Sequence, residues 1–496
     1  MKSERNKENR RNSSFIQFRF HGAQILAYLF VCILILTGCS EKEAAPPARE
    51  VSKEVPKTPP PKETETQPSS VVNYFKALED MERTSGKQSS HTLYFQMRLV
   101  SKDQYAESLL NCAQWVLFNK WIDGSTTSSI VIEAIRENQD SFDLLSKGVQ
   151  IDNPVLPRIN GREMLVPNGE KLYTLALLRL AEAKHSAWEK LKVVDKPDIS
   201  LMEEAEAGLE ILEFGSHFMC DNATLIHYLI GNGIRSYAAD FLIWLVENDR
   251  SFSLDRKDVI NRILSHEEKR KAMFKGWYDD LSIFRDIQLE AYTRILPRDP
   301  KPEFIDLLRK RLSEDIRINA QALTREQILD IYSTNTLARY FNEYLEAGKA
   351  FAELSPAERE KEAEKYEEQA RALSPRRSLY LRNMDIPTVT NLLRLEQMVT
   401  TKLRMVVSAL AIQECIATKR AATPIKSVKA LYLDESWAKD PFTDHELIFT
   451  YEKADIMVLN GELTPWFYTL APGYTQNYDY EIIVPIPQSR VQTQTR

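Results

Sequence analysis

The sequence has 496 residues, of which 43% are hydrophobic and 27% are charged, and this balance excludes a low-complexity polymer and a membrane protein with many spans. Only 15 residues are glycine, about 3% of the chain against roughly 7% in an average protein. Low glycine content disfavours turn-rich β architectures and folds built on glycine phosphate loops. We therefore expect a mainly α protein.

The first 38 residues have the pattern of an export signal. Six basic residues precede an apolar run at residues 25–36, which is too short to span a bilayer comfortably. The run ends in Leu36-Thr37-Gly38-Cys39-Ser40. This pentapeptide resembles the bacterial lipobox, which implies that residues 1–38 are a lipoprotein signal peptide and that the thiol of Cys39 takes a diacylglycerol. Ser40 implies sorting to the outer membrane, where the protein would face the periplasm. The alternative is a signal anchor that happens to contain a cysteine.

Cleavage before Cys39 makes the mature chain more acidic. The removed segment carries six basic and two acidic residues, so the net charge falls from −6 to −10. An acidic balance disfavours nucleic acid as a partner. The expected partners are instead the membrane, through the lipid anchor, and a protein of the cell envelope.

Residues 39–70 are predicted to form a disordered tether. Between residues 41 and 70 there are seven prolines and six glutamates, and the large aliphatic residues are limited to Val51 and Val55. Such a segment cannot bury a core, and proline favours extended conformations. At roughly 3.1 Å per residue, about 30 residues could hold the folded body up to about 90 Å from the lipid.

Residues 71–384 are predicted to form a helical body. Long amphipathic segments with short connections between residues 170 and 295 favour an antiparallel helical array, with a regular solenoid as the alternative. Four capping boxes place a hydroxyl group at the N-cap and Glu or Gln three residues later, and thus predict helix starts. They begin at Ser200, Ser265, Thr324 and Ser355.

The segment from Thr224 to Asn248 is predicted to be central and buried. Its apolar residues cover most of a helical circumference. Gly231 and Gly233 lie inside it, and glycine costs about 1 kcal/mol relative to alanine in a helix. Either a neighbouring helix approaches closely at these glycines or the segment breaks into two helices.

Three residues with metal-ligand chemistry lie close together in the sequence: His217, Cys220 and His227. A zinc site would need a fourth ligand or water, and Asp221 and Asn222 predict a turn or N-cap that puts the two histidines on different elements. Structural histidines are therefore favoured, and we predict no metal and no cofactor.

The remaining cysteines of the mature chain are Cys112, Cys220 and Cys415. Three cysteines permit at most one disulfide, and their spacing cannot choose the pair. We favour three buried apolar cysteines over a bridge.

Other candidates for catalysis are weak. Adjacent Asp279 and Asp280 would face different directions on a helix, which favours solvated surface over a general acid and base. His266-Glu267 lacks the second histidine of a zincin motif, because residue 270 is arginine. Neither a G-x-S-x-G motif nor a phosphate loop occurs. The sequence names no catalytic residue; it leaves enzymatic activity open and favours a protein without it.

Residues 385–496 are predicted to form a small α+β C-terminal module. A long helix at residues 387–420 is followed by short strands, which is an α+β pattern. The strands are expected at 447–451, 455–459, 466–470 and 481–485.

Two elements of this module carry a family resemblance. They are Asp440-Pro441-Phe442-Thr443 and Tyr468-Thr469-Leu470-Ala471-Pro472-Gly473. Together with the long helix they resemble the globular head of type II secretion major pseudopilins, which uncharacterised bacterial envelope proteins reuse. The acidic loop that holds calcium in that family is replaced here by residues 474–479 with one carboxylate, so no calcium site is predicted.

The densest aromatic cluster, Trp466-Phe467-Tyr468, lies in the same module. Aromatic residues can line a groove for peptide or glycan, although core packing is the alternative. We predict a binding surface, if it is aromatic, at these three residues.

Taken together, these features predict a lipid-anchored cell-envelope scaffold or binding protein. One alternative is an accessory subunit of a secretion or pilus-like system. Another is a membrane-tethered enzyme whose site is assembled from residues far apart in the sequence.

Overall fold

The computed structural model describes residues 69–100, 109–118, 124–152, 154–157, 169–192, 200–220, 222–249, 254–269, 300–316, 320–331 and 389–418. It also describes scattered positions between 333 and 365, Trp437, Leu447 and five short strands. The predicted signal peptide, Cys39, the tether up to residue 68 and the Asp279-Asp280 pair lie outside this part of the chain.

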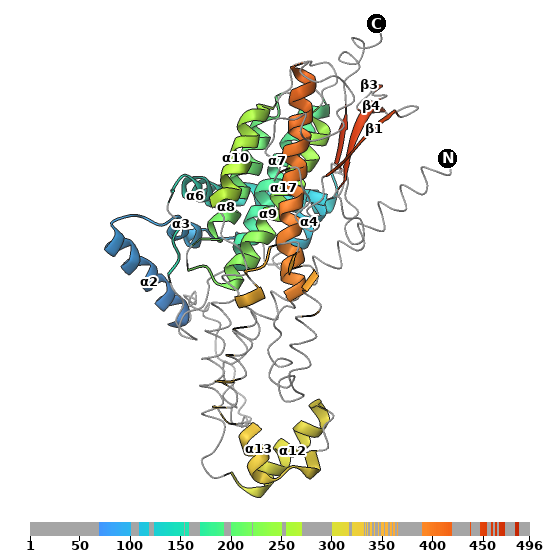
Figure 1. Cartoon of the computed structure of the whole chain (residues 1–496). Helices are drawn as coiled ribbons and strands as arrows, with labels where there is room; N and C mark the ends of the chain where they lie inside the picture. Colours follow the sequence, from blue (N-terminus) through green and yellow to red (C-terminus); the bar gives the residue numbers. More distant parts are fainter. Residues whose placement is uncertain are drawn as a thin grey trace, which may run out of the picture.

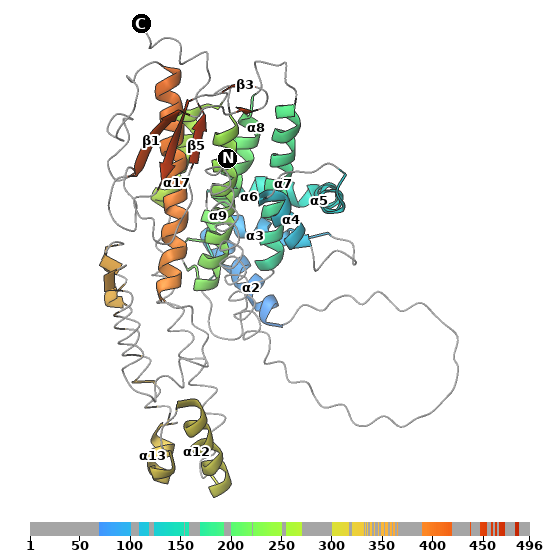
Figure 2. The same cartoon turned by 90° about the vertical axis from the view of Figure 1, so that its right-hand side faces the viewer.

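The described chain is mostly helical, which confirms the predicted mainly α class. The helices of the main bundle are α2 (Ser69–Ser85), α3 (Ser90–Gln96), α4 (Leu109–Phe118), α5 (Thr126–Glu137), α6 (Gln139–Val149), α7 (Gly169–Lys192), α8 (Met202–His217), α9 (Leu225–Asn248), α10 (Arg256–Lys269) and α17 (Val389–Ala417). Helices α7, α8, α9 and α17 run side by side in both views (Figures 1 and 2), and α10 contacts α8 and α17. Helix α9 lies between α7, α8 and α17 and contacts all three.

Helix α9 is unbroken through both of its glycines, so the close-approach alternative is confirmed. A Cβ atom on Gly231 would lie 2.5 Å from the carbonyl oxygen of Gly215 on α8, and one on Gly233 would lie 2.6 Å from the ring of Tyr173 on α7. A Cβ atom on Gly208, which is earlier in α8 than Gly215, would contact Leu242, which is later in α9 than Gly231. The contacts therefore run in opposite directions along the two helices, so α8 and α9 are antiparallel. The absence of side chains lets the two backbones touch.

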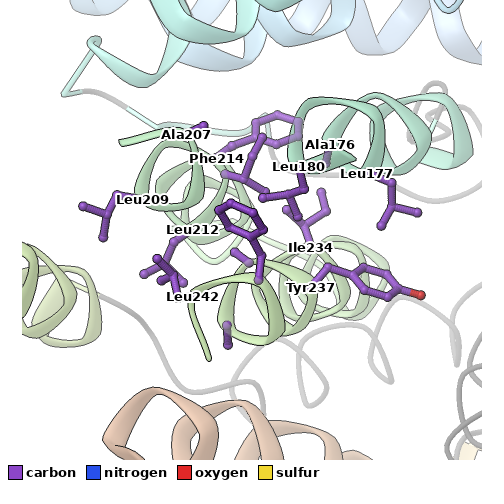
Figure 3. Close-up of a cluster of buried hydrophobic side chains, with 14 of the residues drawn as sticks. Ala176, Leu177, Leu180, Ala207, Leu209, Leu212, Phe214, Ile234, Tyr237 and Leu242 are labelled. Atoms are coloured by element: carbon purple, nitrogen blue, oxygen red, sulfur yellow. The ribbon is translucent and has the colours of Figure 1, made fainter. Parts of the chain in front are cut away.

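The core of the bundle fills the space between α7, α8 and α9. Figure 3 shows side chains from all three helices pointing into one cluster. Leu180, Leu212 and Ile234, one from each helix, are at most 1% exposed. The prediction that residues 224–248 are central and buried is therefore confirmed.

Two of the four predicted capping boxes form. Thr324 and Gln327 exchange hydrogen bonds of 2.8 and 3.2 Å at the start of α13 (Arg325–Ile331), and the box at Ser355 also forms. The prediction at Ser265 is wrong because that residue lies in the last third of α10. The prediction at Ser200 is wrong by one residue, since Leu201 is the N-cap of α8 and makes no side-chain cap.

Helices α12 (Pro302–Ile316) and α13 lie apart from the main bundle, with the short 3-10 helix η2 (Ala320–Ala322) between them in the chain (Figures 1 and 2). They bury a separate small core that consists of Ile305, Leu308, Leu312, Ile328 and Ile331. This pair of helices therefore has packing of its own.

The long helix predicted at 387–420 is α17, and it packs into the main bundle against α9 and α10. Gln413 donates its side-chain amide to the carbonyl of Val246 on α9, at 3.1 Å. Arg256 at the start of α10 pairs with Glu414 at 3.0 Å. The module boundary at residue 385 stays a prediction. A C-terminal module that began there would include α17 and would therefore share its core with the helical body.

The strands are β1 (Ile448–Lys453), β2 (Val458–Leu459), β3 (Glu462–Leu463), β4 (Trp466–Ala471) and β5 (Ile482–Pro485). The backbones of β1, β4 and β5 pair antiparallel in the order β1-β4-β5, and β2 pairs with β3. β4 and β5 contact α17, and β5 also contacts α9. The α+β module as a unit stays a prediction.

Among the described residues, no disulfide joins Cys112, Cys220 and Cys415. Cys415 is buried as predicted, whereas Cys112 and Cys220 are half-buried, so the prediction of three buried cysteines is wrong for these two. The search for membrane spans, made over the same residues, finds no helix long and apolar enough to cross a bilayer.

Candidate functional site

Four histidines gather where α3, α8, α9 and α10 meet. They are His91, His217, His227 and His266, and none is more than 8% exposed. The structure describes five of the seven histidines in the sequence, and the fifth, His185, is half-buried on α7. We call the four residues, with the side chains that contact them, the histidine cluster.

His227 closes the N-terminus of α9. Its Nδ1 accepts the backbone N–H of Thr224 at 3.1 Å, while the Thr224 hydroxyl accepts the backbone N–H of His227 at 3.5 Å, so the two residues form a capping box. The ring proton must then lie on Nε2, which donates to the hydroxyl of Tyr74 on α2 at 3.3 Å. Burial lowers the pKa of His227 to about 3, so the ring is neutral.

His91 on α3 is boxed in by aromatic rings. It stacks on Phe95 with the ring centroids 5.8 Å apart, and Phe218 meets it edge-on at 5.0 Å. Its Nε2 donates to the backbone carbonyl of His217 at 3.0 Å, whereas its Nδ1 has no hydrogen-bond partner among the described residues. Burial, and then the charges of His217 and His227, hold the pKa of His91 well below its ordinary value.

His217 lies in a relay of hydrogen bonds. The Tyr94 hydroxyl donates to its Nδ1 at 2.7 Å, and its Nε2 donates to Oε1 of Glu213 at 2.9 Å. The other carboxylate oxygen of Glu213 pairs with Nδ1 of His266, which joins α8 to α10. Burial, and then the charge of Glu213, raise the pKa of Tyr94 well above its ordinary value, so its hydroxyl keeps its proton.

A buried ion pair lies beside this relay. Arg235 on α9 is fully buried, pairs with Glu267 on α10 and donates to Oδ1 of Asn232 at 3.0 Å. Because two charges are taken out of water together, removal of either partner would leave an uncompensated buried charge. The pair therefore fixes α10 against α9.

A second polar seam attaches α17 to α9. The ammonium of Lys402 lies 2.7 Å from Asp240 and donates to the hydroxyl of Ser236 at 3.0 Å. Burial raises the pKa of Asp240, and Lys402 opposes that rise. The side chain of Lys402 is 1% exposed and that of Asp240 is 19% exposed, so the cation is buried and the carboxylate keeps partial contact with solvent.

The residues with ligand chemistry singled out in the sequence lie near one another but do not make a metal site. His217 ends α8, Cys220 is in the turn, and His227 opens α9, as the predicted separation of the histidines requires. Both ring nitrogens of His217 and of His227 are engaged by protein groups. In the described part of the chain, no three His, Cys, Asp or Glu residues are placed to hold a metal ion.

The predicted aromatic surface falls on β4. Trp466, Phe467 and Tyr468 begin that strand and pair in register with Lys453, Glu452 and Tyr451 of β1. The structure describes only the backbone here, so the predicted binding surface stays a prediction.

Sequence reasoning missed most of the histidine cluster. It set His266-Glu267 aside as an incomplete zincin motif, but His266 pairs with Glu213 and Glu267 pairs with Arg235. One signal was available: Arg235 is an arginine inside an otherwise apolar helical segment, where a buried charge demands a partner. Nothing in the sequence around His217 and His227 indicates that Tyr94 and His91 belong to the cluster, because both lie on α3.

The Tyr94–His217–Glu213 relay has the residue types of a proton-transfer chain. However, Tyr94 is 0% exposed and His217 is 3% exposed, so a substrate cannot reach the relay in this conformation. With His266, the relay fits a structural network that joins α3, α8 and α10.

Comparison with known proteins gives no further assignment. No family model, no curated protein and no solved structure matches this chain.

Proposed function

We propose that the protein is a lipid-anchored cell-envelope scaffold or binding protein, held at the outer membrane through Cys39 and carried into the periplasm by its tether. The single observation that supports anchoring is the Leu36-Thr37-Gly38-Cys39-Ser40 segment after a basic and apolar leader. The Pro-rich tether that follows supports a role at a distance from the bilayer.

The helical body suits a scaffold because charged pairs tie its helices together. Arg235–Glu267 joins α9 to α10, and Lys402–Asp240 joins α17 to α9. Since buried pairs of this kind fix one arrangement of the helices, the body offers a surface of constant shape to a partner.

The lipid anchor is tested by metabolic labelling with a palmitate analogue in a bacterial host. We expect the wild-type chain to take up label and to sediment with membranes. A Cys39→Ser variant should lose the label and accumulate with its signal segment uncleaved. A Ser40→Ala variant is the control, because it keeps the thiol. Label that persists in Cys39→Ser would contradict lipidation at this residue.

The partner is tested by affinity purification of the full-length lipoprotein in mild detergent, followed by mass spectrometry. Helix α17 contributes to the core, so a chain stopped before it is a poor control. A chain stopped after Thr418 keeps α17 and removes the strands. A stoichiometric partner retained by both chains would assign binding to the helical body. The absence of any stoichiometric partner would argue against a scaffold.

A second candidate function is an accessory subunit of a secretion or pilus-like system. It is favoured by the pseudopilin-head resemblance and by the order of α17 followed by an antiparallel β1-β4-β5 sheet. This order supports a small α+β module, with Trp466, Phe467 and Tyr468 as its candidate binding surface. Loss of the partner in the chain stopped after Thr418 would favour this function over general scaffolding.

A further inference from the structure

The two neutral histidines lie between different parts of the bundle. His227 bonds to Tyr74 of α2, and His91 of α3 bonds to the backbone at the end of α8. We propose that His91 and His227 form an acid-sensitive clasp that fastens α2 and α3 to the junction of α8 and α9 and loosens them when the surroundings become acidic.

At His227 a second proton removes one bond of the capping box. The proton would occupy Nδ1, which accepts the backbone N–H of Thr224 at 3.1 Å and lies 2.8 Å from the Thr224 hydroxyl. The hydroxyl can accept the new proton, but the backbone N–H of Thr224 loses its acceptor, so the cap at the start of α9 weakens. The contact with Tyr74 depends on the same ring orientation.

At His91 a second proton has no acceptor. Its Nδ1 has no hydrogen-bond partner among the described residues and lies against aromatic rings. A buried imidazolium without a partner carries a large desolvation cost, so protonation favours a conformation in which His91 meets water.

The other titratable groups around the clasp do not relieve this cost. They are Tyr74 from α2, Tyr94 from α3, Glu213 and His217 from α8, Cys220 from the turn and His266 from α10. Glu213 is the carboxylate in this set, and it is already shared between His217 and His266. Acidification therefore adds positive charge to a site whose anion is engaged.

Helices α2 and α3 are coupled to each other. The carboxylate of Glu82 on α2 accepts the backbone N–H of Ser89 and the hydroxyl of Thr92, both at 2.6 Å. Among the described side chains of α2, Tyr74 and Leu78 are buried, and Phe75 and Met81 pack partly buried against the same core. Because the predicted tether leads into α2, the loosened part would be the one next to the membrane anchor.

The size of the effect follows from the titration of His227. Its pKa is about 3 in the folded chain against an ordinary value of 6.5. The stability that this depressed pKa supplies is complete above pH 6.5 and is lost progressively as the pH falls toward 3. At pH 5, an opening that exposes His227 is favoured about thirtyfold over its value at neutral pH. His91 adds to this in the same direction.

The test is hydrogen–deuterium exchange of the full-length lipoprotein in mild detergent at pH 7.5 and pH 5.0, corrected for chemical exchange. We expect peptides from residues 74–97 to lose protection by about thirtyfold or more at pH 5.0. Peptides from α7 should change much less. Equal corrected protection at both pH values would overturn the proposal.

Variants assign the effect to the clasp. His227→Gln keeps a capping-box residue at this position but does not titrate, so the loss of protection should shrink by about thirtyfold. His185→Gln on α7 is the matched control and should keep the full response. If His227→Gln does not fold, His91→Gln serves, because its amide can still donate to the carbonyl of His217. A full acid response in the variant that folds would overturn the proposal.

Discussion

The contact between α8 and α9 can be tested by a single methyl group. In Gly231→Ala, the new Cβ would lie 2.5 Å from the carbonyl oxygen of Gly215 and 3.1 Å from the Cβ of Phe218. The oxygen belongs to the backbone of α8, so it cannot move without the helix. The two helices must separate locally, and the packing of their shared core loosens.

The magnitude is the difference between two opposing effects. Alanine is better than glycine by about 1 kcal/mol inside a helix. Overpacking costs typically about 1–3 kcal/mol, and a clash with rigid backbone belongs at or above the upper end of that range. We therefore expect Gly231→Ala to lower the free energy of unfolding by about 2 kcal/mol.

The assay is urea unfolding followed by circular dichroism, with Gly208→Ala as the matched control. A Cβ on Gly208 would meet Leu242 at 2.9 Å and Phe241 at 3.0 Å, which are side-chain atoms that can shift. The control should stay within about 1 kcal/mol of the wild type. A Gly231→Ala variant as stable as the wild type would refute the close backbone contact.

Three further changes test the polar contacts by the same urea assay or by exchange. Lys402→Met should cost about 3 kcal/mol at pH 7, the lower end of the range for a broken buried pair, because it leaves the partly exposed Asp240 without a cation. Because burial raises the pKa of Asp240, the carboxylate takes up a proton at a higher pH in the folded chain than in the unfolded chain. The difference in unfolding free energy between the variant and the wild type should therefore shrink as the pH falls. A difference that grows as the pH falls would contradict this expectation. Arg235→Met should also cost about 3–5 kcal/mol, and a second change, Glu267→Leu, should recover most of it; no recovery would argue against a direct pair. Thr324→Ala should weaken the cap of α13 by about 1 kcal/mol and speed exchange there, without any effect on the main bundle.

Local patterns in the sequence predict those features that depend on neighbouring residues. The apolar circumference of residues 224–248 predicts a buried helix, and α9 is one. The box at Thr324 forms because its hydroxyl and Gln327 are three residues apart on one turn. The same pattern fails at Ser265, where α10 has already begun at Arg256 and tertiary packing decides the helix limits.

Contacts between residues far apart in the sequence decide the features that local patterns do not predict. Gly231 could equally have marked a break, and only its contact with Gly215 on α8 selects a continuous helix. His217 and His227 can be placed on separate helices from the sequence, but not opposite Tyr94 or Tyr74, which lie more than 100 residues away. The same holds for α17, whose partners on α9 cannot be inferred from its own periodicity.

The place of α17 in the main bundle decides whether the helical body and the C-terminal strands can act as separate units. It is measured most directly by native-state hydrogen exchange of the full-length chain at pH 7.5. The packing of α17 against α9 predicts that the slowest amides of residues 395–417 open with the same free energy as those of residues 227–248. Amides of α17 that exchange many times faster than those of α9 would contradict a shared core and would restore an independent C-terminal module.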